Sequence, residues 1–310
     1  MTEEKAFRPT TLEEFAGQKQ AKLLLSISIQ AAKKKNQVLD HVLISGPRGT
    51  GKTTTAGIIA NELGKPLKVF AGPSIKKTEE IADILCAIEE GDCIFIDEIH
   101  SLSRKIQEVL YFAMEQYVVD VNVDGFQERV SIPHFTLIGA TTSLGGLEQP
   151  CRDRFQIQVA LTAYDKDDIA EIVKKSFKVL GKDIDHECAV LVGRCARGVP
   201  RVANSFIRRI DDFSTVLSDG KITKEVVLQT LEVLDVNIFG LNKIDRDYLS
   251  WLSRSNKPIG VDTLASALGT DKASIENTIE PFLLQQHYVL KTARGRLITD
   301  EGRKALKGEE

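Results

Sequence analysis

The sequence predicts an α/β domain with a parallel sheet, followed by a small helical domain and by a last domain of short helices with a two-stranded wing. Short apolar runs at 42–44, 67–70, 93–96 and 135–139 alternate with helical segments, which is typical of buried parallel strands. Residues 166–234 show helical patterns only, and the pattern changes again from Leu241. We therefore expect domains at 1–164, 165–235 and 238–310.

The composition is that of an ordinary soluble protein, with 310 residues, 42% hydrophobic and 27% charged, and a net charge of −3. This charge excludes no partner, because a local basic patch can coexist with an acidic total. The five cysteines lack C-x-x-C spacing, so neither a metal site nor a disulfide framework is expected. No N-terminal segment resembles a signal peptide, and no apolar run reaches the about 18 residues of a membrane span. We expect a cytoplasmic protein with no membrane partner.

The strongest motif is a glycine-rich turn between the first apolar run and a helix. Residues 46–53 read G-P-R-G-T-G-K-T, which fits the phosphate-binding loop. Three glycines let backbone N–H groups converge on an anion, and the next helix adds its dipole: Gly46, Gly49 and Gly51. We expect Lys52 to reach the β- and γ-phosphates of ATP and Thr53 to ligate Mg²⁺. A turn with incidental glycines is the weaker alternative.

A second motif follows roughly 45 residues later, where the apolar run at 93–96 leads into Asp97 and Glu98. Alone, such a strand end is often structural, but after a phosphate-binding loop it indicates a nucleotide site. We expect Asp97 to hold the Mg²⁺ shell and Glu98 to polarise the attacking water. Thr142 follows the run at 135–139 and would lie beside them as a γ-phosphate sensor; a threonine-rich turn is the alternative.

Three arginines are the next candidates. Arg152 and Arg154 flank one aspartate, which indicates either an ion-paired surface turn or an arginine finger for a phosphate on a neighbouring subunit. Their position after Thr142 favours the finger. Arg201 follows Pro200 at a helix start, where the dipole disfavours a cation unless an anion is near. This conflict favours a phosphate ligand for Arg201.

A hairpin is predicted from Val119 to Ile132. Valines alternate with polar residues up to Asp124-Gly125, a favoured hairpin turn, and residues 126–132 form the return strand. Apolar residues on such a hairpin indicate either a buried face or a face that docks a partner, and the sequence leaves both open.

The last domain combines three short helices with two strand-like runs at 287–291 and 296–299, the pattern of a winged helix. Three cations cluster on the wing, where we expect contacts with DNA phosphates: Lys291, Arg294 and Arg296. A winged helix that docks a protein is the alternative.

In this order the motifs resemble those of AAA+ ATPases, and finer matches resemble the RuvB family of bacterial Holliday-junction branch-migration motors. The matching stretches are Arg8-Pro9, 40–43 (DHVL), 95–100 (FIDEIH), 135–142 (FTLIGATT), 151–155 (CRDRF) and 280–286 (EPFLLQQ). The resemblance runs from Arg8 to Arg303. It implies a large AAA+ ATPase domain, a helical lid and a winged-helix head, assembled as a homohexameric ring on duplex DNA that works with RuvA and RuvC.

The resemblance also implies residue roles. It places the ATP contacts at Arg8, Gly49, Lys52, Thr53, Thr54, Tyr117, Arg152, Tyr164 and Arg201. Thr142 would be sensor 1, Arg201 sensor 2 and Arg154 the finger acting in trans. The hairpin would dock RuvA, which favours the partner face. The DNA-contacting arginines of the family align with Lys272, Lys291 and Arg296.

The chain departs from the family pattern at several places. In the phosphate-binding loop, Arg48 stands where the family usually has proline, and Gln149-Pro150-Cys151 replaces the usual residues before the arginine pair. Two of the family's DNA-contacting arginines are replaced by Lys272 and Lys291. The hairpin is also shorter than in the family. A divergent RuvB paralogue is therefore one alternative. A clamp-loader-like switch would need a helical collar in place of the wing. A DNA-binding regulator that uses ATP only for assembly would need neither Glu98 nor Arg154.

Overall fold

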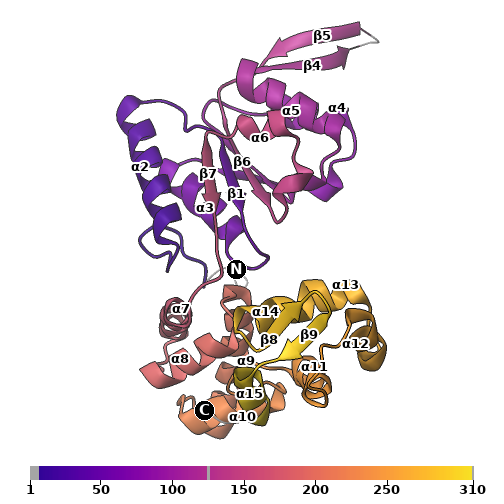
Figure 1. The fold of residues 1–310 in the computed structure, drawn as a ribbon. Helices are drawn as coiled ribbons and strands as arrows, with labels where there is room; N and C mark the ends of the chain where they lie inside the picture. Colours follow the sequence, from indigo (N-terminus) through magenta and orange to yellow (C-terminus); the bar gives the residue numbers. More distant parts are fainter. Residues whose placement is uncertain (1–6, 124–125, 309–310) are drawn as a thin grey trace. The chain divides into compact units, whose positions relative to one another are not determined.

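A five-stranded parallel sheet is the centre of the first of two compact units, Met1–Tyr164, in the computed structural model, which describes residues 7–123 and 126–308. The sheet order is β2-β3-β6-β1-β7 (Figure 1). The strands are β1 (Val42–Ser45), β2 (Leu67–Ala71), β3 (Cys93–Asp97), β6 (Thr136–Thr141) and β7 (Ile157–Ala160). Because all neighbouring strands pair in parallel, the carboxyl ends of all five strands lie on the same side of the sheet, which we call the carboxyl edge.

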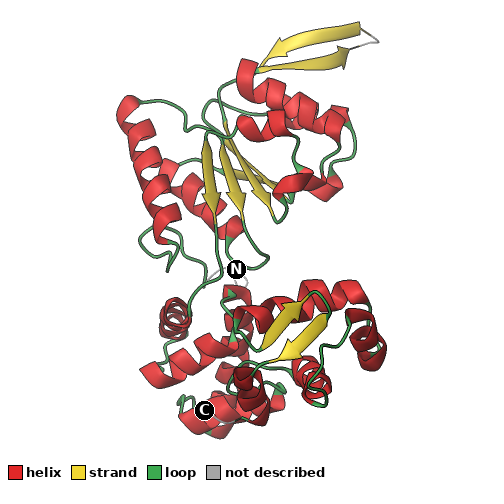
Figure 2. Ribbon diagram, viewed as in Figure 1, coloured by secondary structure: helices red, strands yellow, loops and turns green. Residues whose placement is uncertain are grey.

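Helices cover both faces of this sheet (Figure 2). Val42 and Ile44 share a hydrophobic cluster with α2 (Lys19–Lys35) and α3 (Lys52–Leu63). Leu43 points to the other face and packs with α4 (Thr78–Cys86) and α5 (Arg104–Gln116). Burial on both faces explains why the three central strands β1, β3 and β6 are mostly apolar.

Two details differ from the sequence prediction. The edge strand β7 has no predicted counterpart, because only Ile157 and Val159 of its four residues are buried and so short an alternation is a weak signal. The sequence also predicts a helix around 79–90 that is closed by Gly91, but α4 ends at Cys86. Gly91 does not cap it: Gly91 adopts φ +78° in the turn before β3 and donates its N–H to His134 O at 2.7 Å. Short helices complete the unit: η1 (Gly72–Ser74), η2 (Ile99–Ser101), η3 (Leu144–Gly146) and α6 (Gln149–Asp153).

The predicted hairpin consists of β4 (Val118–Val123) and β5 (Phe126–Ser131), paired antiparallel with Val119 opposite Val130. The predicted turn at Asp124-Gly125 lies outside the described residues. Val119, at the base, is 2% exposed, whereas Phe126, at the far end, is 74% exposed. The hairpin therefore has its base buried in the core and its far end exposed. The buried face is confirmed for the base, and a partner at the far end stays a prediction.

The second unit, Asp165–Glu310, begins with four helices. These are α7 (Lys166–Val179), α8 (His186–Cys195), α9 (Pro200–Leu217) and α10 (Lys224–Val233). Side chains of Asp165, Asp185 and Thr223 accept backbone N–H groups at three of their starts, which satisfies donors that a helix end leaves unpaired. The helical lid predicted from the sequence is confirmed.

A winged-helix fold completes the second unit, as predicted. Its elements are α11 (Lys243–Ser253), α12 (Val261–Leu268), α13 (Lys272–Ser274), the π-helical turn η4 (Ile275–Ile279), α14 (Glu280–Gln285), β8 (Val289–Thr292), β9 (Gly295–Ile298) and α15 (Asp300–Lys307). Strands β8 and β9 pair antiparallel and form the wing. Helix α15 was not predicted from the sequence.

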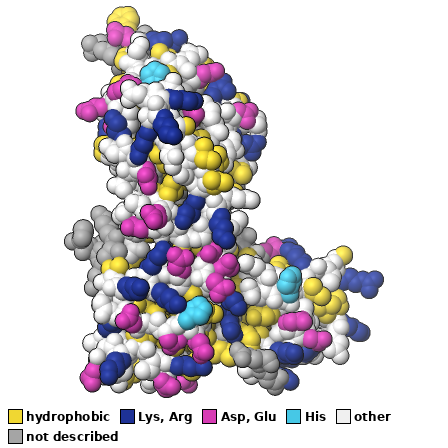
Figure 3. Space-filling view, turned by 90° about the vertical axis from the view of Figure 1, so that its left-hand side faces the viewer, with side chains coloured by type: hydrophobic (Ala, Val, Ile, Leu, Met, Phe, Trp, Pro, Cys, Tyr) yellow, Lys and Arg dark blue, Asp and Glu magenta, His cyan; other side chains and the backbone are white. Residues whose placement is uncertain are grey.

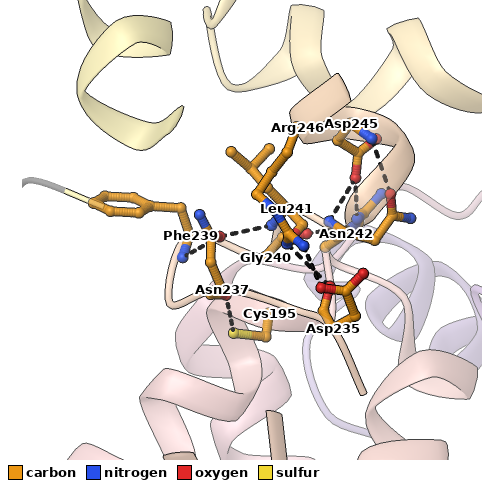
Figure 4. A network of polar contacts seen from close by, with 10 residues as sticks. Cys195, Asp235, Asn237, Phe239, Gly240, Leu241, Asn242, Asp245 and Arg246 are labelled. Atoms are coloured by element: carbon orange, nitrogen blue, oxygen red, sulfur yellow. Dashed lines mark hydrogen bonds and ion pairs between the residues drawn. The ribbon is translucent and has the colours of Figure 1, made fainter. Parts of the chain in front are cut away.

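An ordered linker joins the lid to the winged helix (Figure 4). Asn237 Oδ1 accepts the N–H groups of Phe239 and Leu241 at 3.0 and 2.9 Å, and Cys195 Sγ donates to Asn237 O at 3.5 Å. From the lid, Arg197 donates to Gly240 O at 2.9 Å and to Asp245, at the start of α11, at 2.5 Å. These bonds hold the two parts of the second unit in one arrangement.

Candidate nucleotide site and head cations

The phosphate-binding loop leaves the carboxyl end of β1 and enters α3 at Lys52. Gly46 has φ +148°, and a Cβ there would lie 2.4 Å from Leu161 O, so only glycine fits. Lys52 is 7% exposed. Its ammonium donates to Gly46 O at 2.8 Å and Pro47 O at 3.0 Å. The loop carbonyls thus hold the Lys52 ammonium within the loop.

The sheet order brings the predicted motifs together. Strand β6 lies between β1 and β3, so Thr142 at its end lies between the loop at Gly46 and the carboxylates Asp97 and Glu98. The Gly46 N–H donates to Thr141 O at 3.2 Å. The sequence prediction that a polar residue after β6 lies beside the loop is therefore correct in geometry.

Glu98 is the most constrained residue of this edge. It adopts φ +51°, a left-handed conformation that costs a residue with a side chain about 1–2 kcal/mol. Thr142 Oγ1 donates to Glu98 Oε2 at 2.9 Å, and the Glu98 N–H donates to Asp97 Oδ1 at 3.0 Å. The guanidinium of Arg48, largely exposed, lies 3.8 Å from Glu98 Oε1. Strain and polar contacts of this kind collect at functional sites.

His100 is a member of this site that sequence reasoning missed. Its Nδ1 lies 3.3 Å from Glu98 Oε2 and 2.9 Å from Thr141 Oγ1. The five histidines are scattered in the sequence, and their spacing indicates no site. The available signal was the position of His100 directly after the Asp97–Ile99 stretch at the strand end.

Three of the residues predicted to contact ATP or to act as the finger lie at the amino ends of the strands, opposite the carboxyl edge: Arg152, Arg154 and Tyr117. Arg152 and Arg154 belong to α6 and its end, just before β7, whose first residue Ile157 pairs with Val42 at the start of β1. Tyr117 directly follows α5, and its ring is tilted against that of His134, which precedes β6, with ring centroids 3.9 Å apart. The four residues of β1 span about 13 Å. These side chains are thus placed away from the phosphate-binding loop of their own chain.

Arg154 has one strong partner at this edge. Its guanidinium donates to Glu115 Oε2, on α5, at 2.7 Å. Arg154 Nε is buried and has no hydrogen-bond partner among the described residues. Arg152 hydrogen-bonds Gln149 within α6.

The remaining predicted contacts are distributed over the chain. Tyr164 donates its hydroxyl to Thr50 O at 3.2 Å, beside the loop. Thr53 and Thr54 form the half-buried first turn of α3. Arg8 is exposed in an N-terminal segment that is tied to α3 by Asn61, which donates to Thr10 O at 2.9 Å. Arg201, on α9, is exposed and belongs to the second unit.

The donor set at the loop fits Mg²⁺. The Thr53 hydroxyl and the Asp97 carboxylate are oxygen ligands, which Mg²⁺ prefers, and a site of this class needs only one or two carboxylates because phosphates and waters complete it. These residues follow the carboxyl ends of β1 and β3 at the same sheet edge.

The head cations are placed differently from one another. Lys272 opens α13 and is exposed, and Arg294 is exposed at the turn of the wing. Lys291 is half-exposed and lies 3.3 Å from Glu276. Arg296 is not the exposed wing cation that we predicted: it is 6% exposed and held by Glu280 at 2.6 Å and by Glu276 at 2.9 Å. The two carboxylates, in η4 and at the start of α14, compensate the charge of this buried guanidinium.

Charge on the remaining surface is mixed. On the face drawn in Figure 3, basic and acidic side chains are interspersed with apolar ones. No helix within residues 7–123 and 126–308 is long and apolar enough to cross a membrane.

A phosphate-binding loop, a strained Glu98 bonded to Thr142, a helical lid and a winged helix together define a P-loop ATPase of the AAA+ class with a winged-helix head. Family models match the chain in order: the Holliday junction DNA helicase RuvB P-loop domain at residues 7–161, the RuvB AAA lid domain at 164–237 and the RuvB C-terminal winged helix domain at 238–307. The chain belongs to the RuvB family.

Solved structures agree with this assignment. The chain is 39% identical to the Thermotoga maritima RuvB Holliday junction branch migration motor, over 98% of this chain and 99% of that one, with a TM-score of 0.82. A point mutant of the same Thermotoga maritima protein gives 38% identity, coverage of 97% and 98%, and a TM-score of 0.84. NtrX from Brucella abortus, solved with ADP, is 16% identical over 86% of this chain and 69% of its own, with a TM-score of 0.54, and shares the fold.

Proposed function

We propose that the chain is an ATP-driven motor that moves the branch point of four-way DNA junctions as a homohexameric ring. One observation carries the ring: the phosphate-binding loop and Glu98 lie at one edge of the sheet, whereas Arg154 lies at the other. A site that needs both is completed by a neighbouring copy. Membership of the RuvB family supports the same assembly on DNA.

The loop residues bind ATP in this proposal. Lys52 and the N–H groups of the loop hold the phosphates, and Tyr164 closes the site from the Thr50 side. Arg8 and Thr54 contact the nucleotide from the N-terminal segment and from α3. Arg201 is the lid residue that senses the γ-phosphate. Arg152 and Tyr117, like Arg154, contact the nucleotide of the adjacent copy.

Hydrolysis is driven by positioning. Thr53 and Asp97 would hold Mg²⁺, which neutralises charge on the phosphates when bound. Glu98 orients the attacking water, and Thr142 fixes the Glu98 carboxylate through their hydrogen bond. Arg154 from the neighbour stabilises the charge that develops on the γ-phosphate. Turnover at one site therefore requires correct placement of the adjacent copy.

The other domains connect this cycle to DNA and partners. With domains at 1–164, 165–235 and 238–310, the last domain contacts duplex phosphates through Lys272, Lys291 and Arg294, and through the Nη2 of Arg296 on the side of Glu276. The exposed far end of the hairpin, at Phe126, docks RuvA. RuvC is the resolvase that acts on the same junctions, and the bacterial cytoplasm is where this assembly works.

The test is ATP-dependent dissociation of a synthetic four-way junction, with and without the cognate RuvA. Dissociation that requires both ATP and RuvA supports the proposal. ATP hydrolysis without junction processing, with RuvA shown to be active in parallel on a known partner, contradicts it and favours a divergent paralogue or a clamp-loader-like switch.

A further inference from the structure

The helical segment behind the wing contains an irregular turn. Residues Ile275–Ile279 form the π-helical turn η4 between α13 and α14. Such turns are rare and are frequently found at functional sites. This one carries Glu276, and Glu280 follows at the start of α14. Both carboxylates face the wing strands, where Lys291 and Arg296 lie opposite each other.

The two carboxylates have different environments. Glu280 is 1% exposed, accepts the Tyr248 hydroxyl at 2.9 Å, and accepts Arg296 Nε and Nη2 at 2.6 and 3.1 Å. A buried carboxylate with all these donors is a fixed part of the core, since removing one partner of a buried pair is strongly destabilising. Glu280 therefore orients Arg296 permanently.

The carboxylate of Glu276, in contrast, is exposed enough for another anion to take its place. Its side chain is 33% exposed, and its single atom Oε1 accepts from Arg296 Nη2 at 2.9 Å and from Lys291 Nζ at 3.3 Å. Hydrogen bonds from Arg296 and Lys291, together with the charge of Lys272, lower the pKa of Glu276 below its usual value. The carboxylate thus lies among the three cations that align with the family's DNA contacts.

An anionic oxygen shared by a lysine and an arginine is also the environment of a phosphate oxygen in a protein–DNA complex. We propose that Glu276 occupies the position of a DNA phosphate oxygen in the DNA-free head, and that DNA must displace it from Lys291 and Arg296. This rests on the proposed DNA contact of the head. It makes Glu276 a residue that weakens DNA binding and eases release, which a protein that moves along DNA requires at each step.

The experiment is a salt titration of duplex DNA binding by the full chain without nucleotide, followed by fluorescence anisotropy. Glu276→Gln keeps the side-chain shape but removes the competing charge. We expect about three- to tenfold tighter binding, because two partly exposed ion pairs no longer oppose DNA. The slope of log affinity against log salt should steepen by about one, since one more cation is left for phosphate. Glu276→Asp keeps the charge on a shorter side chain, so its affinity for DNA should lie between those of the wild type and Glu276→Gln.

The matched control is Glu301→Gln, the same change at an exposed residue of α15, which should leave affinity unchanged. Thermal unfolding of each variant shows that the head is folded. If Lys291→Ala weakens DNA binding but Glu276→Gln leaves it unchanged or weakens it, the role proposed for Glu276 is wrong. The DNA contact of the head would still stand. Absence of duplex binding by both wild type and Glu276→Gln overturns the DNA contact of the head itself, and this proposal with it.

Discussion

Thr142 donates its hydroxyl hydrogen to the carboxylate of Glu98 at 2.9 Å. The bond joins the ends of two neighbouring strands, β6 and β3. It ties the residue expected to sense the γ-phosphate to the residue expected to orient water. Because the donor is a single hydroxyl, its contribution can be removed without changing side-chain shape.

Replacing Thr142 by valine should slow hydrolysis and spare binding. A hydrogen bond to a charged group contributes about 1.5–3 kcal/mol, so we expect kcat to fall about 10- to 100-fold. The ATP dissociation constant, measured with a fluorescent analogue, should change less than about twofold. Thr142→Ser retains the hydroxyl and is the control. A valine variant with kcat near wild type would refute the assigned role.

His100 should act on hydrolysis through Glu98. Its Nδ1 lies 3.3 Å from the Glu98 carboxylate and 2.9 Å from Thr141 Oγ1. We expect His100→Phe to lower kcat about tenfold with little change in KM, because Glu98 loses one orienting contact. His100→Asn, which can place an N–H near the same point, should recover much of the rate. Equal loss in both variants would indicate a purely structural role.

Two inactive variants should restore each other if Arg154 acts in trans. Lys52→Ala removes the phosphate contact of its own loop, and Arg154→Ala removes the proposed finger. Each alone should hydrolyse ATP at least about 100-fold more slowly, given the usual contribution of such an arginine. When mixed rings form, an Arg154→Ala site beside a Lys52→Ala copy regains a finger, and activity should return in part.

The control for this mixing experiment is size-exclusion chromatography with differently labelled variants, which shows that mixed rings assemble. If mixed rings form but ATP hydrolysis does not recover, Arg154 does not act in the nucleotide site of the neighbouring copy. Glu115→Gln removes the negative charge from the partner that Arg154 contacts at 2.7 Å, and this variant should still bind ATP.

Acid should weaken the first unit through His41. This residue is 3% exposed, accepts the Leu137 N–H on Nδ1 at 3.0 Å and directs Nε2 at Met114 O at 3.2 Å. Burial lowers its pKa from 6.5 to about 4. Between these values the unfolded chain binds a proton that the folded chain does not, so stability is lost as pH falls from about 6.5 to 4. The loss from this group reaches about 3 kcal/mol.

Urea unfolding at pH 7 and pH 5 measures this effect. In His41→Gln the amide can accept and donate at similar positions without titrating, so its stability should depend less on pH. His287→Gln, at an exposed position, is the control and should retain the wild-type pH dependence. Equal pH dependence in His41→Gln and wild type would show that another group causes the acid sensitivity.

Local patterns were sufficient for most of the fold. The loop from Gly46 to Lys52 and the helix starts at Asp165 and Thr223 depend on contacts within a few residues. The central strands pair with distant strands, but their buried runs are apolar enough to be recognised locally. Strand β7 and helix α15 were missed because each has few buried residues, Ile157 and Val159 in β7 and Gly302 and Ala305 in α15. The π-helical turn at Ile275–Ile279 interrupts a segment that has a regular helical pattern in the sequence.

The sequence by itself determined the nucleotide motifs, since their spacing is dictated by one loop, one strand end and the backbone freedom of glycine. Only the tertiary structure decided which side chains meet. It brought His100 to Glu98, separated Arg154 and Tyr117 from the loop by the length of β1, and buried Arg296 between Glu276 and Glu280. These outcomes depend on strand order and on packing between distant elements, and neither is written in any local run of residues.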